Sequence, residues 1–295
     1  MRSDARSDGF ILYTVLGMVA LLSTVFVTIS IAARNSVEGI ATTQADLADN
    51  ALLQAGLHMA GYQLVVLRRT LAAVDGQEIR LDGGVVRLGV SSDAGKADLN
   101  GSDRLVLAAA YRASGLEAME PETFAARIID WRDADDTPSP GGAEQADYGA
   151  AGLPFGPGNR AFASIEELRW VLGVSVTDIE ALSGLLTVFN PLGRLSLTAA
   201  EPRLVAALEG MDETRMALID SARDVTDPAV LTALLSQLAE SAQFFSIDPP
   251  TVFRVSIAAE ATGSARRAIV EAVIIPPVDD GEPFLIADWK RRVSG

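Results

Sequence analysis

The sequence predicts an α+β fold in which one long N-terminal helix packs on a small antiparallel sheet and a helical domain is inserted between the strands. Three observations lead to this prediction. The first quarter of the chain follows a helical pattern, two strand pairs with glycine turns lie far apart, and the sequence between those pairs is helical in periodicity. A sheet whose strands are segregated from most of the helices is typical of the α+β class.

The composition indicates a folded, acidic chain with a restricted chemistry. Of its 295 residues 49% are hydrophobic, and 24 basic residues oppose 39 acidic ones, so the net charge is −15. This balance argues against a nucleic-acid partner, because phosphate backbones are bound by clustered Lys and Arg. The absence of Cys excludes thiolate chemistry and disulfides. The single His, His58, is interpreted as a helix-surface residue that faces another helix or solvent.

An uncharged segment, residues 10–33, follows a short polar leader, residues 1–9. The segment is long enough to cross a bilayer core of about 30 Å as a helix. No small-residue cleavage site closes it, as one would close a secretory signal peptide. Arg2 and Arg6 favour a cytoplasmic N-terminus, which places the rest of the chain on the far side of the membrane.

The helical pattern continues beyond the membrane segment. A stripe that includes Val37, Leu47 and Met59 recurs at steps of three and four residues, so we expect one helix from Phe10 to about Leu71. Such a helix would be about 90 Å long. Three glycines weaken it locally: Gly39, Gly56 and Gly61. Its second half offers an apolar face to the domain that follows.

Two strand pairs supply the sheet. Residues 78–93 alternate around a turn at Asp82-Gly83-Gly84, and residues 251–276 alternate around a turn at Thr262-Gly263-Ser264. The first hairpin closes a segment, residues 34–97, that begins with the amphipathic helix. The second belongs to a C-terminal segment, residues 244–295. Residues 98–243 between them read as an inserted α-helical domain.

The insertion carries a weak internal repeat. Residues 99–110 resemble residues 197–208, and each stretch is followed by a second predicted helix, which gives helix-hairpin-helix-like units. Residues 164–182 form a third predicted pair with a turn at Gly173. Hairpins of this kind bind DNA phosphates through two turn glycines and nearby cations. Here the second glycine is missing and acids such as Glu209 stand nearby, so we interpret the hairpins as packing modules.

An acidic loop follows the second predicted helix. Six acids fall within eighteen residues: Asp130, Asp133, Asp135, Asp136, Glu144 and Asp147. Oxygen ligands without Cys or His suit a hard cation, Ca²⁺ before Mg²⁺, although the spacing is not that of an EF-hand. The alternative is a solvated acidic loop in which Asp135 and Asp136 cap a turn. We expect Trp131 and Tyr148 to pack the loop onto the core.

A leader ending in Gly9, then Phe10, then an uninterrupted apolar helix that continues as an amphipathic one, resembles the type IV prepilin family. The resemblance implies that a prepilin peptidase cuts after Gly9 and methylates the new amino terminus at Phe10. Most members carry Glu at the fifth mature position, where it neutralises the terminal ammonium of a neighbouring subunit. Thr14 stands there in this chain and cannot do so, which fits a subunit with no neighbour above it.

The order of segments DWRDADD, PGGAE, GLPFGPGN and FASIEEL, from Asp130 on, resembles the K-type minor pseudopilin family of the type II (general) secretion pathway. The resemblance covers nearly the whole chain, from Gly9-Phe10 to Asp288-Trp289. Two departures are the acids in the leader and LSLTAAEP, a loose version of the family's Asn-Thr-Ala segment.

This resemblance implies a pseudopilin fold and a subunit that caps the tip of a periplasmic pseudopilus, starts its assembly and helps export folded proteins across the outer membrane. The implied partners are the I- and J-type minor pseudopilins, the H-type one, inner-membrane platform proteins, the prepilin peptidase and the secreted substrates. The implied location is the inner membrane, in a single pass, and then the pseudopilus tip.

We expect no enzymatic activity, because the sequence shows no nucleophile–base pair, oxyanion-hole motif or phosphate loop. Two other functions compete with the structural one. A membrane-anchored DNA-uptake protein would use the helix hairpins, which the acidic charge disfavours. A periplasmic hydrolase would use paired carboxylates of the acidic loop, whose close like charges are more typical of cation ligation.

Overall fold

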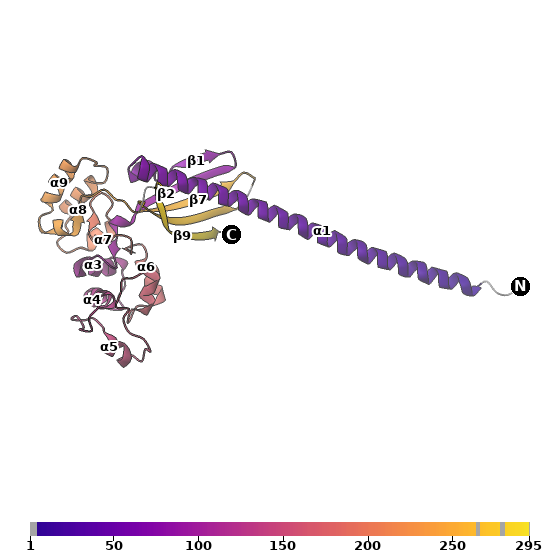
Figure 1. Cartoon of the computed structure of the whole chain (residues 1–295), viewed down its shortest axis with the longest axis horizontal. Helices are drawn as coiled ribbons and strands as arrows, with labels where there is room; N and C mark the ends of the chain where they lie inside the picture. Colours follow the sequence, from indigo (N-terminus) through magenta and orange to yellow (C-terminus); the bar gives the residue numbers. More distant parts are fainter. Residues whose placement is uncertain (1–4, 264–265, 278–280, 295) are drawn as a thin grey trace.

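The computed structural model describes residues 5–263, 266–277 and 281–294, and its longest element is the N-terminal helix α1, Ala5–Gly61. At 57 residues α1 is about 85 Å long, and its first half projects from the head of the molecule (Figure 1). A π-helical turn, η1, Tyr62–Val66, continues it. The helix therefore ends about five residues before the predicted end at Leu71, and α2, Leu71–Val74, is a separate turn.

A five-stranded sheet packs against the second half of α1, which confirms the predicted α+β fold. The strands are β1, Glu78–Leu81, β2, Gly84–Ser92, β7, Phe253–Ala261, β8, Arg267–Ile275, and β9, Leu285–Ser294. Their order is β1-β2-β7-β8-β9 and every pairing is antiparallel. Both predicted hairpins are present, and β9 completes the sheet as an edge strand.

The core of this head lies between α1 and the sheet. Leu53 and Leu57 of α1 are buried together with Val86, Ile257 and Val270 of the strands. The helix lies so close to the sheet that a Cβ on Gly56 would be 2.6 Å from Val86 Cγ1 and 2.8 Å from Ile257 Cγ2. The packing of the helix on the sheet therefore requires glycine at position 56, although glycine destabilises the helix itself.

A helical domain is inserted between β2 and β7. Ser92, the last residue of β2, pairs with Phe253, the first of β7, so the chain leaves and re-enters the sheet at neighbouring points. The inserted elements are η2, Asp93–Gly95, β3, Ala97–Asp98, α3, Arg104–Ser114, α4, Pro121–Arg132, α5, Gln145–Ala150, η3, Ile165–Trp170, α6, Val176–Leu182, β4, Leu186–Thr187, β5, Leu195–Ser196, α7, Pro202–Ala207, α8, Glu213–Ser221, α9, Pro228–Gln237, η4, Ala239–Phe244, and β6, Phe245–Ser246. The insertion has a hydrophobic core of its own.

The insertion is built from two similar halves, as the internal repeat predicted. In the first half β3 pairs in parallel with β4 around α3 and α4, and in the second β5 pairs in parallel with β6 around α7 and α8. Arg132 at the end of α4 donates to the carbonyl of Ser102 before α3, at 2.9 Å. Arg223 after α8 donates to the carbonyl of Ala200 before α7, at 3.1 Å. Equivalent residues therefore close equivalent hairpins. The third predicted pair differs, because its first member is the 3₁₀ helix η3.

A buried carboxylate joins the insertion to the sheet. Asp93 of η2 is fully buried and accepts two hydrogen bonds from Arg254 of β7, at 3.0 and 2.7 Å. It also accepts from the Thr187 hydroxyl of β4 at 2.8 Å and lies 3.2 Å from Lys96 Nζ. Burial acts to raise the pKa of Asp93, but the hydrogen bonds and charges of Arg254 and Lys96 outweigh it and hold that pKa below its usual value.

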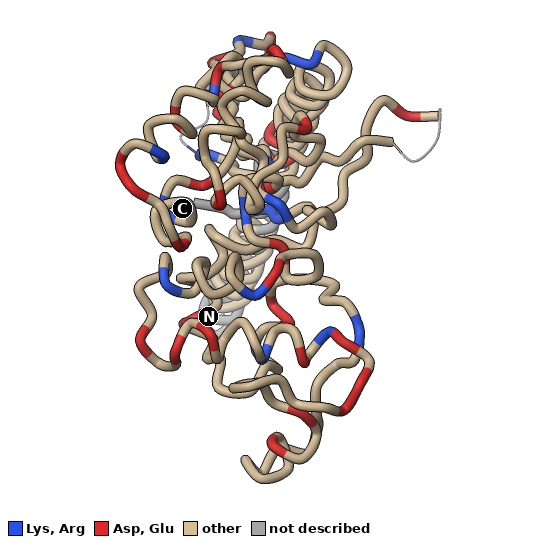
Figure 2. The backbone as a smooth tube through the Cα atoms, turned by 90° about the vertical axis from the view of Figure 1, so that its left-hand side faces the viewer, with Lys and Arg blue, Asp and Glu red and all other residues tan. Residues whose placement is uncertain are grey.

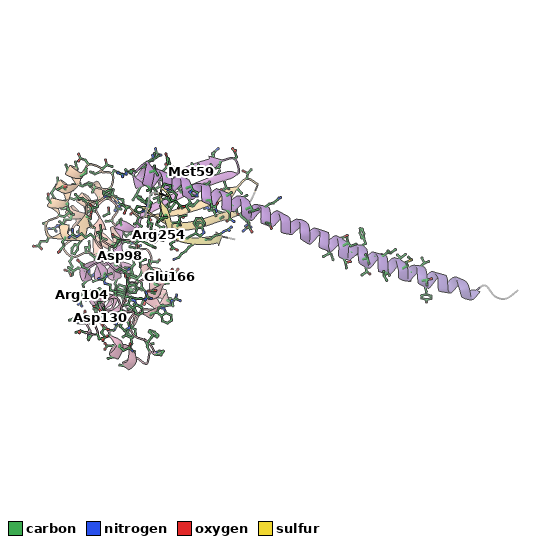
Figure 3. The ribbon with its side chains drawn as sticks, in the orientation of Figure 1. Met59, Asp98, Arg104, Asp130, Glu166 and Arg254 are labelled. Atoms are coloured by element: carbon green, nitrogen blue, oxygen red, sulfur yellow. The ribbon has the colours of Figure 1, made fainter. Side chains whose placement is uncertain are left out.

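A second contact between the two parts lies at the edge strand. Lys290 of β9 donates to Glu166 of η3 at 2.6 Å. The Lys290 hydrogen bond, partly opposed by burial, lowers the pKa of Glu166 to about 2. Both side chains are about half exposed, so solvent screens this pair and the Asp93 cluster is the stronger joint. Figure 3 labels Arg254 on the sheet and Glu166 on the insertion.

We predict that Asp93→Asn lowers the free energy of unfolding at pH 7 by about 3 kcal/mol, because it leaves Arg254 and Lys96 without their buried counter-charge. Because the pKa of Asp93 is lower in the folded than in the unfolded chain, its stabilisation is complete above the unfolded pKa and disappears as the pH falls through the folded pKa. The difference between wild type and variant should therefore shrink in strong acid. Urea unfolding of the detergent-solubilised chain measures it.

The matched control for this variant is Asp82→Asn, in the exposed turn between β1 and β2. It removes the same charge where no burial is involved and should change stability by less than about 0.5 kcal/mol. Equal effects of the two substitutions would contradict the role assigned to Asp93.

Candidate functional site

The acidic loop lies between α4 and α5, at the far end of the first half of the insertion (Figures 1 and 3). Asp130, in the last turn of α4, is fully buried, and Glu144, the residue before α5, is 3% exposed. Asp133 is half-buried, whereas the other three predicted ligands are exposed: Asp135, Asp136 and Asp147. The six acids are thus divided into an inner and an outer set.

Asp130 is held by the backbone of the loop. The Ser139 N–H donates to its two carboxylate oxygens at 3.1 and 3.3 Å. Gly142 passes so close that a Cβ there would lie 1.8 Å from Asp130 Oδ2. Any larger residue at position 142 would displace the carboxylate, so the Gly141-Gly142 pair of the sequence is part of the site.

Glu144 and Asp133 have buried oxygens without a partner. Both carboxylate oxygens of Glu144 and Oδ1 of Asp133 are inaccessible and accept no hydrogen bond in the structure. Burial, followed by the negative charges of Asp130, Asp133 and the outer acids, raises the pKa of Glu144 to about 7. Burial and the charges of Asp135 and Asp130 also raise the pKa of Asp133. A buried, unpartnered carboxylate surrounded by acids is destabilised until a proton or a cation neutralises it.

Two outer acids have local structural roles. Asp135 Oδ1 accepts from the Thr137 N–H at 2.8 Å, which is the turn cap that the sequence offered as an alternative. Asp147 Oδ2 accepts from the Glu144 N–H at 2.9 Å and caps α5. Within the described residues no group of three or more acidic or His side chains is arranged as a metal site. Ligation would require the inner carboxylates to move together.

Aromatic side chains fix the loop to the core, as predicted for Trp131 and Tyr148. Trp131 is 4% exposed and stacks on Phe162, with ring centroids 5.7 Å apart. Tyr148 of α5 is buried, and its hydroxyl accepts from the Leu172 N–H at 3.0 Å. The loop is therefore anchored on both sides of its acids.

The helix hairpins use their basic residues internally. Arg127 Nη1 donates to the Leu172 carbonyl beside the Gly173 turn, at 2.6 Å. Arg215 Nη1 donates to the Gly210 carbonyl and to Asp212, at 2.7 and 2.8 Å. These cations stabilise turns rather than face a phosphate backbone, which supports the interpretation of the hairpins as packing modules.

The first half of α1 has the properties of a membrane segment. Residues 13–31 have a mean hydropathy of 2.2, and none of them is buried against the rest of the chain. The Thr24 hydroxyl donates to the Ala20 carbonyl at 2.8 Å, so this polar group is satisfied inside the helix. Thr14 is exposed on the helix surface. Gly9 and Phe10 lie within α1, but the Phe10 side chain is outside the described part of the structure.

The second half of α1 carries an exposed apolar surface that the periodicity did not separate from the core face. Leu47 and Met59 belong to the predicted stripe, yet they are 64% and 37% exposed, so their assignment to the core face was wrong. Tyr62 and Val66, on η1, are also exposed. The signal was available in the sequence, because apolar residues occupy more of the helix circumference than one packed face needs.

Three comparisons relate the chain to known proteins. Residues 89–191 match the family model for type II secretion system (T2SS), protein K. The type II secretion system protein K of Pectobacterium carotovorum subsp. carotovorum is 40% identical over 60 residues, which is 20% of this chain and 18% of that protein. A chain in the crystal structure of the GspK-GspI-GspJ complex from the enterotoxigenic Escherichia coli type 2 secretion system superposes with a TM-score of 0.63 at 18% identity, over 88% of this chain and 100% of that chain.

Proposed function

We propose that this chain is a member of the type II secretion system protein K family, and that it is a minor pseudopilin that caps the tip of the periplasmic pseudopilus and starts its assembly for the export of folded proteins. The observation that carries the proposal is the inserted domain. It enlarges the head at the end of α1 opposite the membrane segment (Figure 1). A head of this width would collide with neighbours inside a helical filament but has room at its end.

The two halves of α1 have different roles in assembly, namely membrane anchoring and packing against other subunits. Residues 13–31 anchor the chain in the inner membrane, with the N-terminus in the cytoplasm and the head in the periplasm. The exposed surface of Leu47, Met59, Tyr62 and Val66 then packs against the helices of other subunits. In the structure of the E. coli relative the named partners are GspI and GspJ, and we propose their counterparts as the first neighbours of this chain.

Under this proposal the chain has further partners and acts without catalysing a reaction. An H-type minor pseudopilin and the inner-membrane platform would contact the assembly helix, and the secreted substrates would meet the head. Thr14 lacks the carboxylate that would neutralise a neighbour's terminal ammonium, which supports a first position in the filament. The protein would act by position and shape alone.

We predict that replacing residues 93–252 by a short turn between Ser92 and Phe253 removes the restriction to the tip. The two strand ends are paired neighbours, so β2 and β7 can be joined directly. In a pseudopilus-forming bacterium, site-specific cross-linking through α1 should find the full chain once per filament and the shortened chain at repeated positions. A shortened chain that still occurs once per filament would contradict the steric basis of the cap.

We predict that the mature chain begins at N-methylated Phe10, after a prepilin peptidase cuts behind Gly9. Intact-mass analysis of the membrane fraction should show the loss of residues 1–9 and one added methyl group. Gly9→Leu should block processing while the chain still inserts in the membrane. An N-terminus near residue 33 would instead indicate a cleaved signal peptide.

We also propose that the acidic loop binds Ca²⁺. The inner residues Asp130, Asp133 and Glu144 would supply ligands, because the unpartnered buried oxygens of Glu144 and Asp133 fit a hard cation. Asp135 and Asp136 could add oxygens from the rim, while Asp147 already caps α5. The bound cation would contribute charge neutralisation and would fix the loop on the insertion.

We predict that millimolar Ca²⁺ raises the melting temperature of the detergent-solubilised chain by about 5 °C, as expected for a site filled at about a hundred times its Kd. Glu144→Gln, which keeps the side-chain shape, should reduce this shift strongly. Asp147→Asn keeps an acceptor for the α5 cap and serves as the control, with the shift retained. The cation proposal fails if wild type shows no shift, or if both variants respond alike.

A further inference from the structure

A depression lies between α7 and α8, in the second half of the insertion. Its volume is about 270 Å³. It is lined by Pro202, Val205, Met216, Ala217, Ile219, Asp220 and Arg223. Val205 and Ile219 are 2% exposed and form the floor, whereas the Met216 side chain is 36% exposed and forms part of the wall.

One side of the depression carries a partly exposed ion pair, Asp220 with Arg223. Arg223 Nε donates to Asp220 Oδ1 at 2.9 Å, and its Nη2 donates to the Ala200 carbonyl at 3.1 Å. The two charges neutralise each other, and Arg223 is held in place. The Asp220 side chain is 78% exposed and can meet a further cation.

The surrounding lobe has a strong excess of negative charge. Between Glu201 and Glu240 there are eight acidic and three basic residues. Each of the three arginines is paired with an acid, namely Glu201, Asp212 or Asp220. Among the described residues the other five acids of the lobe form no ion pair with a basic side chain: Glu209, Glu213, Asp224, Asp227 and Glu240. Figure 2 views the molecule from this end and shows acidic positions outnumbering basic ones.

The neighbouring helix α9 adds an uncharged surface. Its ten residues include no charged side chain, only Leu231 is fully buried, and Val230 is 44% exposed. α9 lies beside α8 at the end of the molecule opposite the N-terminus (Figure 1). Apolar surface inside a charged rim is the usual anatomy of a protein interface, and its charge selects the partner.

We propose that the depression between α7 and α8 is a docking site for another protein, and that it receives one large apolar side chain flanked by Lys or Arg. The apolar floor supplies the affinity for the side chain, and the unpaired acids of the lobe supply the charge complementarity. Because the site lies at the end opposite the membrane segment, it is separate from the exposed surface of α1 (Figure 1).

Methionine methyl NMR of the full chain in lipid nanodiscs tests this proposal. The six methionines include Met216 in the wall of the depression and the exposed Met59 on α1, which reports non-specific binding. Acetyl-Lys-Leu-Phe-Lys-amide should shift the Met216 signal saturably and leave Met59 unchanged. The shift should weaken several-fold between 50 and 500 mM salt. Acetyl-Glu-Leu-Phe-Glu-amide should produce no shift.

Variants separate the apolar and the electrostatic parts. Ala217→Phe, which fills the depression from its exposed wall, should abolish the Met216 shift while the melting temperature is retained. Glu213→Gln with Asp224→Asn should weaken binding several-fold, and Glu117→Gln, an exposed acid outside the lobe, should not. The proposal is overturned if both peptides act alike, if Met59 responds as Met216 does, if neither responds at 5 mM peptide, or if the charge variants bind equally.

Discussion

The geometry of the whole molecule depends on how one buried carboxylate holds the insertion against the sheet. The carboxylate of Asp93 is surrounded by the guanidinium of Arg254 on β7, the ammonium of Lys96 just after η2 and the hydroxyl of Thr187 on β4. Such a cluster tolerates little displacement, because each partner would otherwise leave an uncompensated charge in the interior. The insertion therefore has a fixed direction relative to α1, which the proposed role as a cap requires.

In the acidic loop, by contrast with Asp93, buried carboxylates lack neutralising partners. Asp130 has a backbone donor, the Ser139 N–H, but Glu144 and Asp133 keep buried oxygens without any, and four other acids of the loop raise the pKa of Glu144. Folding brings these carboxylates together against their electrostatic repulsion, while Trp131 and Tyr148 hold both ends of the loop on the core. A site of this kind is incomplete on its own. Its stability depends on a proton or a cation that the surroundings supply.

Much of the fold follows from local signals in the sequence. The hairpins around Gly83 and Gly263 were predictable because alternation and turn residues are neighbours in the chain, and the two halves of the insertion were predictable because they resemble each other. The two-residue parallel pairings, such as β3 with β4, carry no comparable signal, since two residues define no period. Gly56 shows what helix propensity cannot predict. The sequence indicates that this glycine destabilises the helix, but not that it lies against Val86 of the sheet. In the acidic loop, composition indicated the cluster of acids but not which of them are buried and which cap a turn or a helix. The spacing of Glu144 and Asp147 could have indicated a helix cap, since acceptors three residues apart are typical of helix N-termini.

The pairing of Ser92 with Phe253 has a consequence for the order of folding. The strands β2 and β7 are neighbours in space but are separated by the entire insertion in the chain, so their ladder closes a very long loop. Closing a disordered loop of that length costs entropy that no single strand contact repays. A folded insertion changes this, because its own core holds its two ends together and reduces the closure to a short step. The domain that we propose as the basis of the cap thereby also acts as the template on which the sheet of the head is assembled.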